Sequence, residues 1–385
     1  MARPVAIVAT GQTHHCKARP DVHQGELVQE AVAAALLDAD LSFDDIDAIV
    51  LTNMELFEGR ALPELWCGEF AGGVGKPVMK VATGGTSGTS GAIAGLMQAA
   101  SGVFDTVLVV GWEKHSEGST QTGMSLTDPA WDRHIASGAI GNFALSISQY
   151  VAGRSVTPEQ AAMVAVKARR NGALNPHAHL KDADLSVEQV LASPMLAEPV
   201  HLLDMCPQSD GAAALVIAGG DVAWRYPNPA WFVASATRHD HPYFGDLDQR
   251  LLKMRTLRAA AAEAYRKAGI AQPLTDLDVA EVYEPVSYAE LAWYEALGFC
   301  DDGQAGALIE SGDTQLGGKL PVNPSGGVLC ANPVGATGVV RVAEAAKQLH
   351  QKAGDYQVDG ANLALVTGYG VYAWSDVLIF SAHKP

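Results

Sequence analysis

The sequence has few basic residues, few aromatic residues and no long apolar run. Lys and Arg together number 26 against 43 Asp and Glu, which gives a formal net charge of -17. An acidic chain is a poor general binder of nucleic acid or anionic membrane, although a local basic patch for a phosphorylated cofactor stays compatible with it. No apolar segment reaches the roughly 18 to 20 residues that a membrane-spanning helix needs. We therefore expect no nucleic-acid partner and no membrane span.

Cysteine is also sparse. The five cysteines are scattered along the chain and odd in number, which favours reduced thiols over a disulfide framework. The amino terminus leads directly into a strand-like segment without a secretory pattern, so we expect a cytoplasmic protein. His14, His15 and Cys16 are adjacent, and adjacent side chains on a strand point apart, so we expect no metal site there.

Glycine is abundant, and it concentrates in two similar segments. Residues 83–91 read Thr-Gly-Gly-Thr-Ser-Gly-Thr-Ser-Gly, and residues 332–338 read Asn-Pro-Val-Gly-Ala-Thr-Gly. Each segment opens a helix of small or apolar residues that leads towards a buried strand. Such a turn presents backbone N–H groups at a positive helix end, which suits an anion or a developing oxyanion.

The two glycine segments belong to a longer internal repeat. A strand, a helix, a second strand, the glycine turn with its helix and a third strand occur once in residues 1–225 and again in residues 226–385. This alternation predicts an α/β architecture of two duplicated halves with mixed sheets and helices. An insert at about residues 116–201 is expected to form a cap over a site between the halves.

Several ordered motifs resemble the thiolase superfamily, in particular its sterol-carrier-protein-x and archaeal branch. They are the two glycine segments, Gln-Ser-Asp-Gly-Ala-Ala-Ala at 208–214, Leu-Gly-Phe-Cys at 297–300 and Asn-Pro-Ser-Gly-Gly at 323–327. The resemblance covers essentially the whole chain. It implies two mixed sheets with central and flanking helices, an acyl-coenzyme A thioester as substrate, no bound cofactor and no metal.

The side chains of thiolase acyl transfer are absent from the positions that match. The nucleophilic cysteine of the family falls on Gly85, and its two histidines fall on Tyr283 and Asn332. A thiolase needs a thiolate to hold the acyl group and a histidine to activate it. Stabilising an acyl-CoA enolate needs only donors aimed at the thioester oxygen. The chain in this respect resembles the steroid side-chain retro-aldolases of the superfamily, which lack the cysteine.

Three functions remain open from the sequence. The first is a carbon–carbon lyase that cleaves a β-hydroxyacyl-CoA of lipid or steroid degradation by a retro-aldol reaction. The second is an acyltransferase that uses another nucleophile, with Cys330 as a displaced candidate. The third is a non-catalytic acyl-CoA-binding subunit. The resemblance further implies a homodimer and a small partner with an OB-fold and a zinc ribbon.

The candidate site residues follow from the resemblance and from the glycine turns. We expect the catalytic groups to be Tyr283 as a proton donor or relay, Asn332 as an oxyanion donor, Tyr369 and His115. The loops that surround them are expected to contribute Gly85, Ser87, Gly368 and Gly370. For Ser87 we expect helix N-capping, because no histidine accompanies it. We expect Cys206 and Cys300 to be core residues.

Overall fold

The computed structural model describes residues 3–118, 138–241, 250–370 and 373–384. These residues form a nine-stranded mixed sheet of order β3-β2-β4-β7-β1-β8-β11-β10-β9, plus a small β5-β6 hairpin. The strands are β1 (Val5–Gln12), β2 (Ala48–Thr52), β3 (Val78–Val81), β4 (Thr106–Lys114), β5 (Met195–Ala197), β6 (Val200–His201), β7 (Asp210–Gly219), β8 (Ala230–His239), β9 (Val279–Glu281), β10 (Leu363–Gly370) and β11 (Trp374–Ser381). The predicted α/β class is therefore confirmed.

The large sheet consists of two parts with the same plan. In the first part β2 runs parallel to β4, and β7 lies antiparallel to both β4 and β1. In the second part β9 runs parallel to β10, and β11 lies antiparallel to both β10 and β8. The two parts meet where β1 pairs with β8 through Ala6–Trp231 and Ile7–Ala230. The predicted duplication is thus present strand for strand among the described residues, except that a single parallel bridge between Ala280 and Val322 stands beside β9 in the place of β3.

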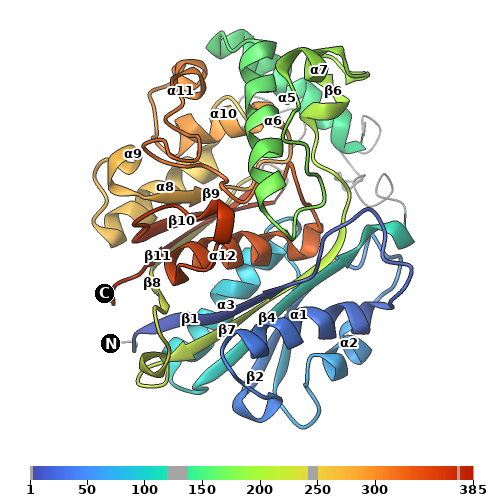
Figure 1. Ribbon diagram of the computed structural model, residues 1–385, viewed down its shortest axis with the longest axis vertical. Coiled ribbons are helices and arrows are strands. Elements are labelled where there is room, and N and C mark those ends of the chain that lie inside the picture. Colours follow the sequence, from blue (N-terminus) through green and yellow to red (C-terminus); the bar gives the residue numbers. More distant parts are fainter. Residues whose placement is uncertain (1–2, 119–137, 242–249, 371–372, 385) are drawn as a thin grey trace.

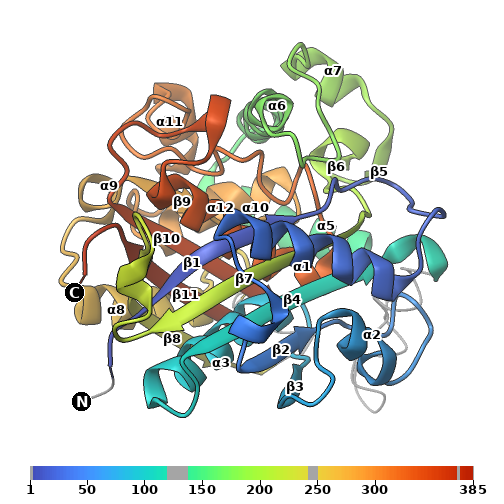
Figure 2. The ribbon, with the colours of Figure 1, turned by 60° about the horizontal axis from the view of Figure 1, so that its bottom comes forward.

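Helices cover both faces of each half (Figures 1 and 2). Helices α3 (Ser87–Ser101) and α12 (Val334–His350) pack against each other and against strands of the two halves. Helices α1 (Gln24–Asp38) and α2 (Glu64–Phe70) lie outside the first half, and α8 (Arg255–Ala268) lies against β8 and β11 of the second. The apolar stripe of α1, formed by Leu27, Val28, Ala31, Val32, Ala35 and Leu36, is buried on the sheet.

The two central helices meet backbone to backbone at their first turns. A Cβ atom on Gly88 would lie 2.5 Å from the backbone nitrogen of Val339, and one on Gly338 would lie 2.3 Å from that of Thr89. Farther along, the buried side chains of α3 include the small Ala92 and Ala99, and those of α12 include Val339 and Ala343. The glycines of the two turns therefore bring the amino-terminal ends of α3 and α12 together.

The insert adds a helical layer over the second half (Figure 1). It contains α5 (Gly138–Arg154), α6 (Pro158–Leu174), α7 (Val187–Ala192) and the β5-β6 hairpin. Helix α6 packs on α10 (Ser287–Ala296) and α11 (Ala305–Ser311), and the short α9 (Pro273–Asp276) precedes β9. Part of the expected cap, residues 119–137, lies outside the described residues. Among the helices of the described ranges, none combines the length and apolarity of a membrane span.

Replacing Gly88 with Ala tests the close crossing of the central helices. The added Cβ meets backbone atoms of α12 that cannot rotate away, so we expect a loss of at least about 3 kcal/mol in the free energy of unfolding, the upper range for overpacking. Gly68→Ala on α2 is the matched control, because its nearest neighbour atom would lie 3.9 Å away. Chemical denaturation measures the free energy of unfolding of both variants. Equal stability of the two would contradict the close contact between α3 and α12.

Candidate active site

A pocket of about 1060 Å³ opens where the turns before α3 and α12 meet the ends of β9 and β10. Its inner part is lined by residues 83–85 of the first turn, by Asn332 and Val334 of the second, and by Tyr283 and Tyr369. Helix α5 and the β5-β6 region contribute an apolar wall that includes Ile140, Phe143, Leu196 and Leu202. The duplicated turns thus converge on one cavity, which makes it the candidate active site.

The structure brings most of the predicted site residues together. Six of the eight predicted residues line the pocket: Gly85, His115, Tyr283, Asn332, Tyr369 and Gly370. Ser87 and Gly368 do not line it. A Cβ on Gly368 would lie 2.0 Å from Thr89 Oγ1, so this glycine serves the packing of β10 against α3.

Ser87 is not the N-cap that the sequence suggests. The N-cap position of α3 belongs to Thr86, and Ser87 is the first helical residue. Its hydroxyl donates to the carbonyl oxygen of Gly84 at 2.6 Å and accepts from the backbone N–H of Thr83 at 2.9 Å. The Ser87 side chain is fully buried, and both hydrogen bonds of its hydroxyl are made within the glycine turn. Ser87 therefore stabilises the conformation of that turn.

Gly85 leaves no room for a side chain. A Cβ at this position would lie 2.2 Å from the carbonyl oxygen of Tyr369 and 3.6 Å from the hydroxyl oxygen of Tyr283. Contacts below 3.0 Å to a backbone oxygen require the backbone itself to move. The space in which a nucleophile at this position would stand is thus occupied by a main-chain carbonyl, with a phenol beside it.

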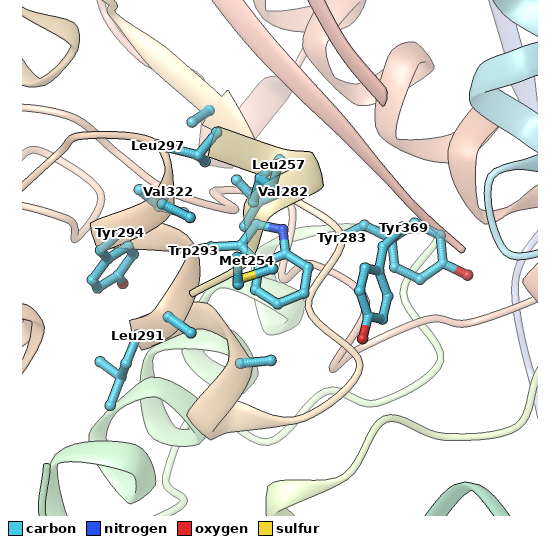
Figure 3. Packing of buried hydrophobic residues seen from close by; sticks show 14 of the residues in the cluster. Met254, Leu257, Val282, Tyr283, Leu291, Trp293, Tyr294, Leu297, Val322 and Tyr369 are labelled. Carbon is cyan, nitrogen blue, oxygen red and sulfur yellow. The ribbon is translucent and has the colours of Figure 1, made fainter. Parts of the chain in front are cut away.

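Tyr283 follows β9 and is held by a neighbouring strand. Its backbone N–H donates to Thr367 Oγ1 on β10 at 2.9 Å, and Trp293 Nε1 donates to the same oxygen at 3.3 Å. Its ring lies beside that of Tyr369, with centroids 6.3 Å apart (Figure 3). Burial raises the pKa of Tyr283 well above its usual range, and a hydrogen bond with Thr337 opposes this only in part. The phenol is therefore protonated at neutral pH, and its hydroxyl has a proton to donate, although the raised pKa makes it a weaker acid than a tyrosine in water.

Asn332 is fixed on both sides of its amide. Its Nδ2 donates to Cys206 Sγ at 3.2 Å, and its Oδ1 accepts from Thr337 Oγ1 at 2.9 Å. The backbone N–H of Asn332 donates to Ser209 Oγ at 3.1 Å. The second Nδ2 hydrogen meets no acceptor in the described part of the chain and is available to a ligand oxygen. Thr337 contacts both Asn332 and Tyr283, so it couples the two predicted groups.

His115 has a structural contact that the sequence does not reveal. Its Nε2 accepts the backbone N–H of Val334 at 3.3 Å, at the start of α12, and its ring lies on Phe57 with centroids 4.3 Å apart. Burial lowers the pKa of His115 to about 4, and the nearby Asp210 opposes the shift. A neutral imidazole that accepts a helix-end N–H stabilises the second turn, and its Nε2 lone pair is occupied.

Cys206 lies in the pocket, whereas Cys330 lies outside it. Cys206, expected in the core, lines the pocket beside Asn332. Burial raises the pKa of Cys206 to about 12, so its thiol is protonated and a weak nucleophile. Cys330 is buried behind the pocket, where its Sγ donates to the carbonyl oxygen of Ala168 at 3.0 Å. Its position matches a small core residue better than a displaced nucleophile.

His179 is a pocket residue that the sequence reasoning passed over. It lies in the insert, in the segment Asn-Pro-His-Ala-His at 175–179, and its ring lines the pocket. Its Nδ1 is 2.9 Å from Ser209 Oγ, the hydroxyl that also accepts the backbone N–H of Asn332. The sequence gave one weak indication, namely two histidines close together in the predicted cap. No pattern in the sequence predicted that either would lie near the second glycine turn.

Comparison with known proteins shows the family of the chain. Residues 5–221 match the family model "Thiolase, N-terminal domain", and residues 236–382 match "Thiolase C-terminal domain-like". An acetyl-CoA acetyltransferase of Methanothermobacter thermautotrophicus is 32% identical over 380 residues, which cover 96% of each chain. Sterol carrier protein 2 of Gallus gallus is 29% identical over 96% of this chain and 70% of its own length.

Solved structures share the fold over almost the whole chain. A structure described as an "Ltp2-ChsH2(DUF35) aldolase" superimposes with a TM-score of 0.85 at 25% identity, covering 98% of this chain and 97% of that one. Human mitochondrial 3-ketoacyl-CoA thiolase superimposes with a TM-score of 0.73 at 17% identity, over 99% of both chains. With both halves matched by family models, the chain belongs to the thiolase family.

Proposed function

We propose that this protein is a carbon–carbon lyase that cleaves a β-hydroxyacyl-CoA thioester by a retro-aldol reaction without an acyl-enzyme. The observation that carries the proposal is the geometry at Gly85, where the carbonyl of Tyr369 fills the space of a nucleophilic side chain. Retro-aldol cleavage needs no nucleophile. It needs an oxyanion site for the enolate, a base for the β-hydroxyl and an acid for the enolate carbon.

The pocket supplies groups for two of these three tasks. Asn332 has an amide hydrogen available for the thioester oxygen, and the backbone at Gly370 lies on the same wall. Tyr283 is a protonated phenol beside Gly85, which has no nucleophilic side chain. The cationic side chains of Lys17 and Arg250 also line the pocket, and we propose that they hold the phosphates of coenzyme A despite the acidic chain.

The apolar wall indicates the acyl group. Ile140, Phe143, Leu196 and Leu202 present hydrocarbon to a cavity of about 1060 Å³, which is large for a short acyl chain. A bulky hydroxyacyl group of lipid or steroid origin fits this volume. The aligned aldolase is described together with a DUF35 protein, and we propose that a small partner with an OB-fold and a zinc ribbon likewise binds this chain.

Tyr283→Phe tests the proposed proton donor. The substitution keeps the ring and removes the hydroxyl, so we expect turnover to fall by about 10²- to 10⁴-fold, the usual contribution of general acid–base catalysis. Binding of the CoA ester should change little. The measurement is release of aldehyde or ketone from a panel of β-hydroxyacyl-CoA thioesters that includes 3-hydroxy-3-phenylpropionyl-CoA, assayed with and without a partner. Unchanged turnover on a substrate that the wild type cleaves would contradict the assignment.

Gly85→Cys tests the absence of acyl-transfer chemistry. Its Cβ would clash with the Tyr369 carbonyl, and no histidine stands at position 283 or 332, so we expect no thiolysis of acetoacetyl-CoA and no acetylated protein in an intact-mass spectrum. The wild type should behave the same way. Thiolysis by the wild type that is lost in Cys206→Ser would instead assign the protein as an acyltransferase that uses the pocket thiol.

We further propose a homodimer that forms along the exposed strand β3. This strand is the edge of the described sheet and presents free main-chain groups that an unprotected edge offers to another strand. Val78 and Met79 on β3 are 42% and 48% exposed, and Met97 on the neighbouring α3 is 65% exposed. Together they form an apolar margin next to the first glycine turn.

A charge on β3 should weaken the dimer. We expect the wild type to have a dimer mass by light scattering at micromolar concentration, and Met79→Lys to shift towards the monomer. Met195→Lys is the control, because Met195 is 55% exposed on the distant β5 hairpin and its variant should remain dimeric. A monomeric wild type, with or without the small partner, would rule out the proposal.

A further inference from the structure

The proposed cleavage requires a base that the reading of the sequence did not identify. The proton of the β-hydroxyl must leave as the Cα–Cβ bond breaks. Tyr283 cannot take it while it remains protonated to donate to the enolate carbon. Among the described residues that line the pocket there is no Asp or Glu, so the usual carboxylate base is absent from that part of the wall.

Histidines are then the natural bases of the pocket, and their contacts distinguish them. His115 uses its Nε2 lone pair to accept the N–H of Val334. His239 is exposed at the end of β8, with its ring edge-on to Trp374 at 5.2 Å between centroids. His179 is partly buried and binds Ser209 through Nδ1, while its Nε2 contacts no hydrogen-bonding group in the described ranges.

The partner of His179 can accommodate both charge states of the ring. Ser209 Oγ already accepts the backbone N–H of Asn332. A serine hydroxyl has one proton and two lone pairs. Its second lone pair can therefore accept Nδ1–H of the neutral tautomer that keeps a lone pair on Nε2, and it can accept the same Nδ1–H in the imidazolium. Ser209 is fully buried, and its backbone N–H donates to the carbonyl oxygen of Asn332 at 3.4 Å. The ring is therefore held against the segment that carries the proposed oxyanion donor.

The surroundings of His179 keep its ring neutral. Burial lowers the pKa of His179, as do His14, Arg169 and Lys17, while Asp210 raises it. The ring is consequently neutral at pH 7, the state in which Nε2 can accept a proton. Asp210, the next residue after Ser209, provides a negative charge near the imidazolium that forms.

We infer that His179 is the general base that removes the β-hydroxyl proton in the proposed retro-aldol cleavage. The O–H proton passes to His179 Nε2, and the O–H electron pair forms the C=O bond of the released aldehyde or ketone. The Cα–Cβ pair becomes the enolate of the thioester, and the Tyr283 hydroxyl proton passes to Cα. Return of the proton from the imidazolium to the tyrosinate through solvent restores both groups.

The inference rests on the proposed function and is tested by separating cleavage from enolisation. In D₂O, exchange of the α-hydrogens of the acyl-CoA product needs the ionised form of Tyr283 as the base at Cα and the oxyanion donors, but no β-hydroxyl base. Because burial keeps Tyr283 protonated at neutral pH, the exchange is followed at alkaline pH over long incubations. We expect His179→Gln to lower the cleavage rate by about 10²- to 10⁴-fold while it keeps most of the exchange. Tyr283→Phe should lose both. Added imidazole should restore part of the cleavage activity to His179→Ala.

His177→Gln is the matched control, because His177 lies two residues away, binds the carbonyl oxygen of Thr13 through Nδ1 at 3.1 Å and is outside the pocket. It should cleave like the wild type, and thermal denaturation should show that all variants are folded. Wild-type cleavage rates in His179→Gln, or equal losses of cleavage and exchange, would overturn the role of His179 alone. A wild type that neither cleaves any hydroxyacyl-CoA nor catalyses exchange would overturn the proposed function together with this inference.

Discussion

The close approach of α3 and α12 at Gly88 and Gly338 is the contact on which the candidate site depends. Each glycine faces the backbone of the opposite helix, and no larger residue fits at either position. Because the helices meet at their amino-terminal ends, the loops that precede them share one cavity. That cavity receives Gly85 from the first half and Asn332 from the second. The positive amino-terminal ends of both helices thus lie at one place, and their dipoles favour the negative charge of the proposed enolate oxygen.

The same scaffold then decides which chemistry the cavity can support. In this chain the carbonyl of Tyr369 stands where a side chain on residue 85 would be, and the phenol of Tyr283 lies beside it. Burial keeps that phenol and the nearby Cys206 thiol protonated. The described wall of the pocket therefore combines a protonated phenol and thiol with the imidazoles of His115 and His179, whose pKa values burial lowers. This set of groups supports the proposed proton transfer around an enolate.

Much of the fold could be predicted from the sequence because its signals are local. The glycine turns, the apolar stripe of α1 and the repeated strand–helix order follow from spacing and composition, and the structure has all of them. The convergence of Tyr283, Asn332 and Tyr369 on one pocket followed from the family resemblance. These positions are held by backbone contacts that the shared fold dictates.

The errors have a common physical origin in contacts between distant segments. Ser87 looked like an N-cap, but the turn folds so that its hydroxyl bonds back to Thr83 and Gly84. Cys206 looked like a core residue, yet Asn332 reaches it across 126 residues of sequence. His179 gains its place only because the insert lies against Ser209. No spacing rule encodes such pairs, since each depends on how the insert and the two halves pack together.

A crystal structure with a non-hydrolysable β-hydroxyacyl-CoA analogue would test whether the pocket supports enolate chemistry without a covalent intermediate. We expect the thioester oxygen within hydrogen-bonding distance of Asn332 Nδ2 and the Tyr283 hydroxyl next to Cα. We also expect the Tyr369 carbonyl still to occupy the space beside Gly85. A thioester carbon placed instead against the Cys206 sulfur or a serine or threonine hydroxyl, with Tyr283 remote from Cα, would contradict it.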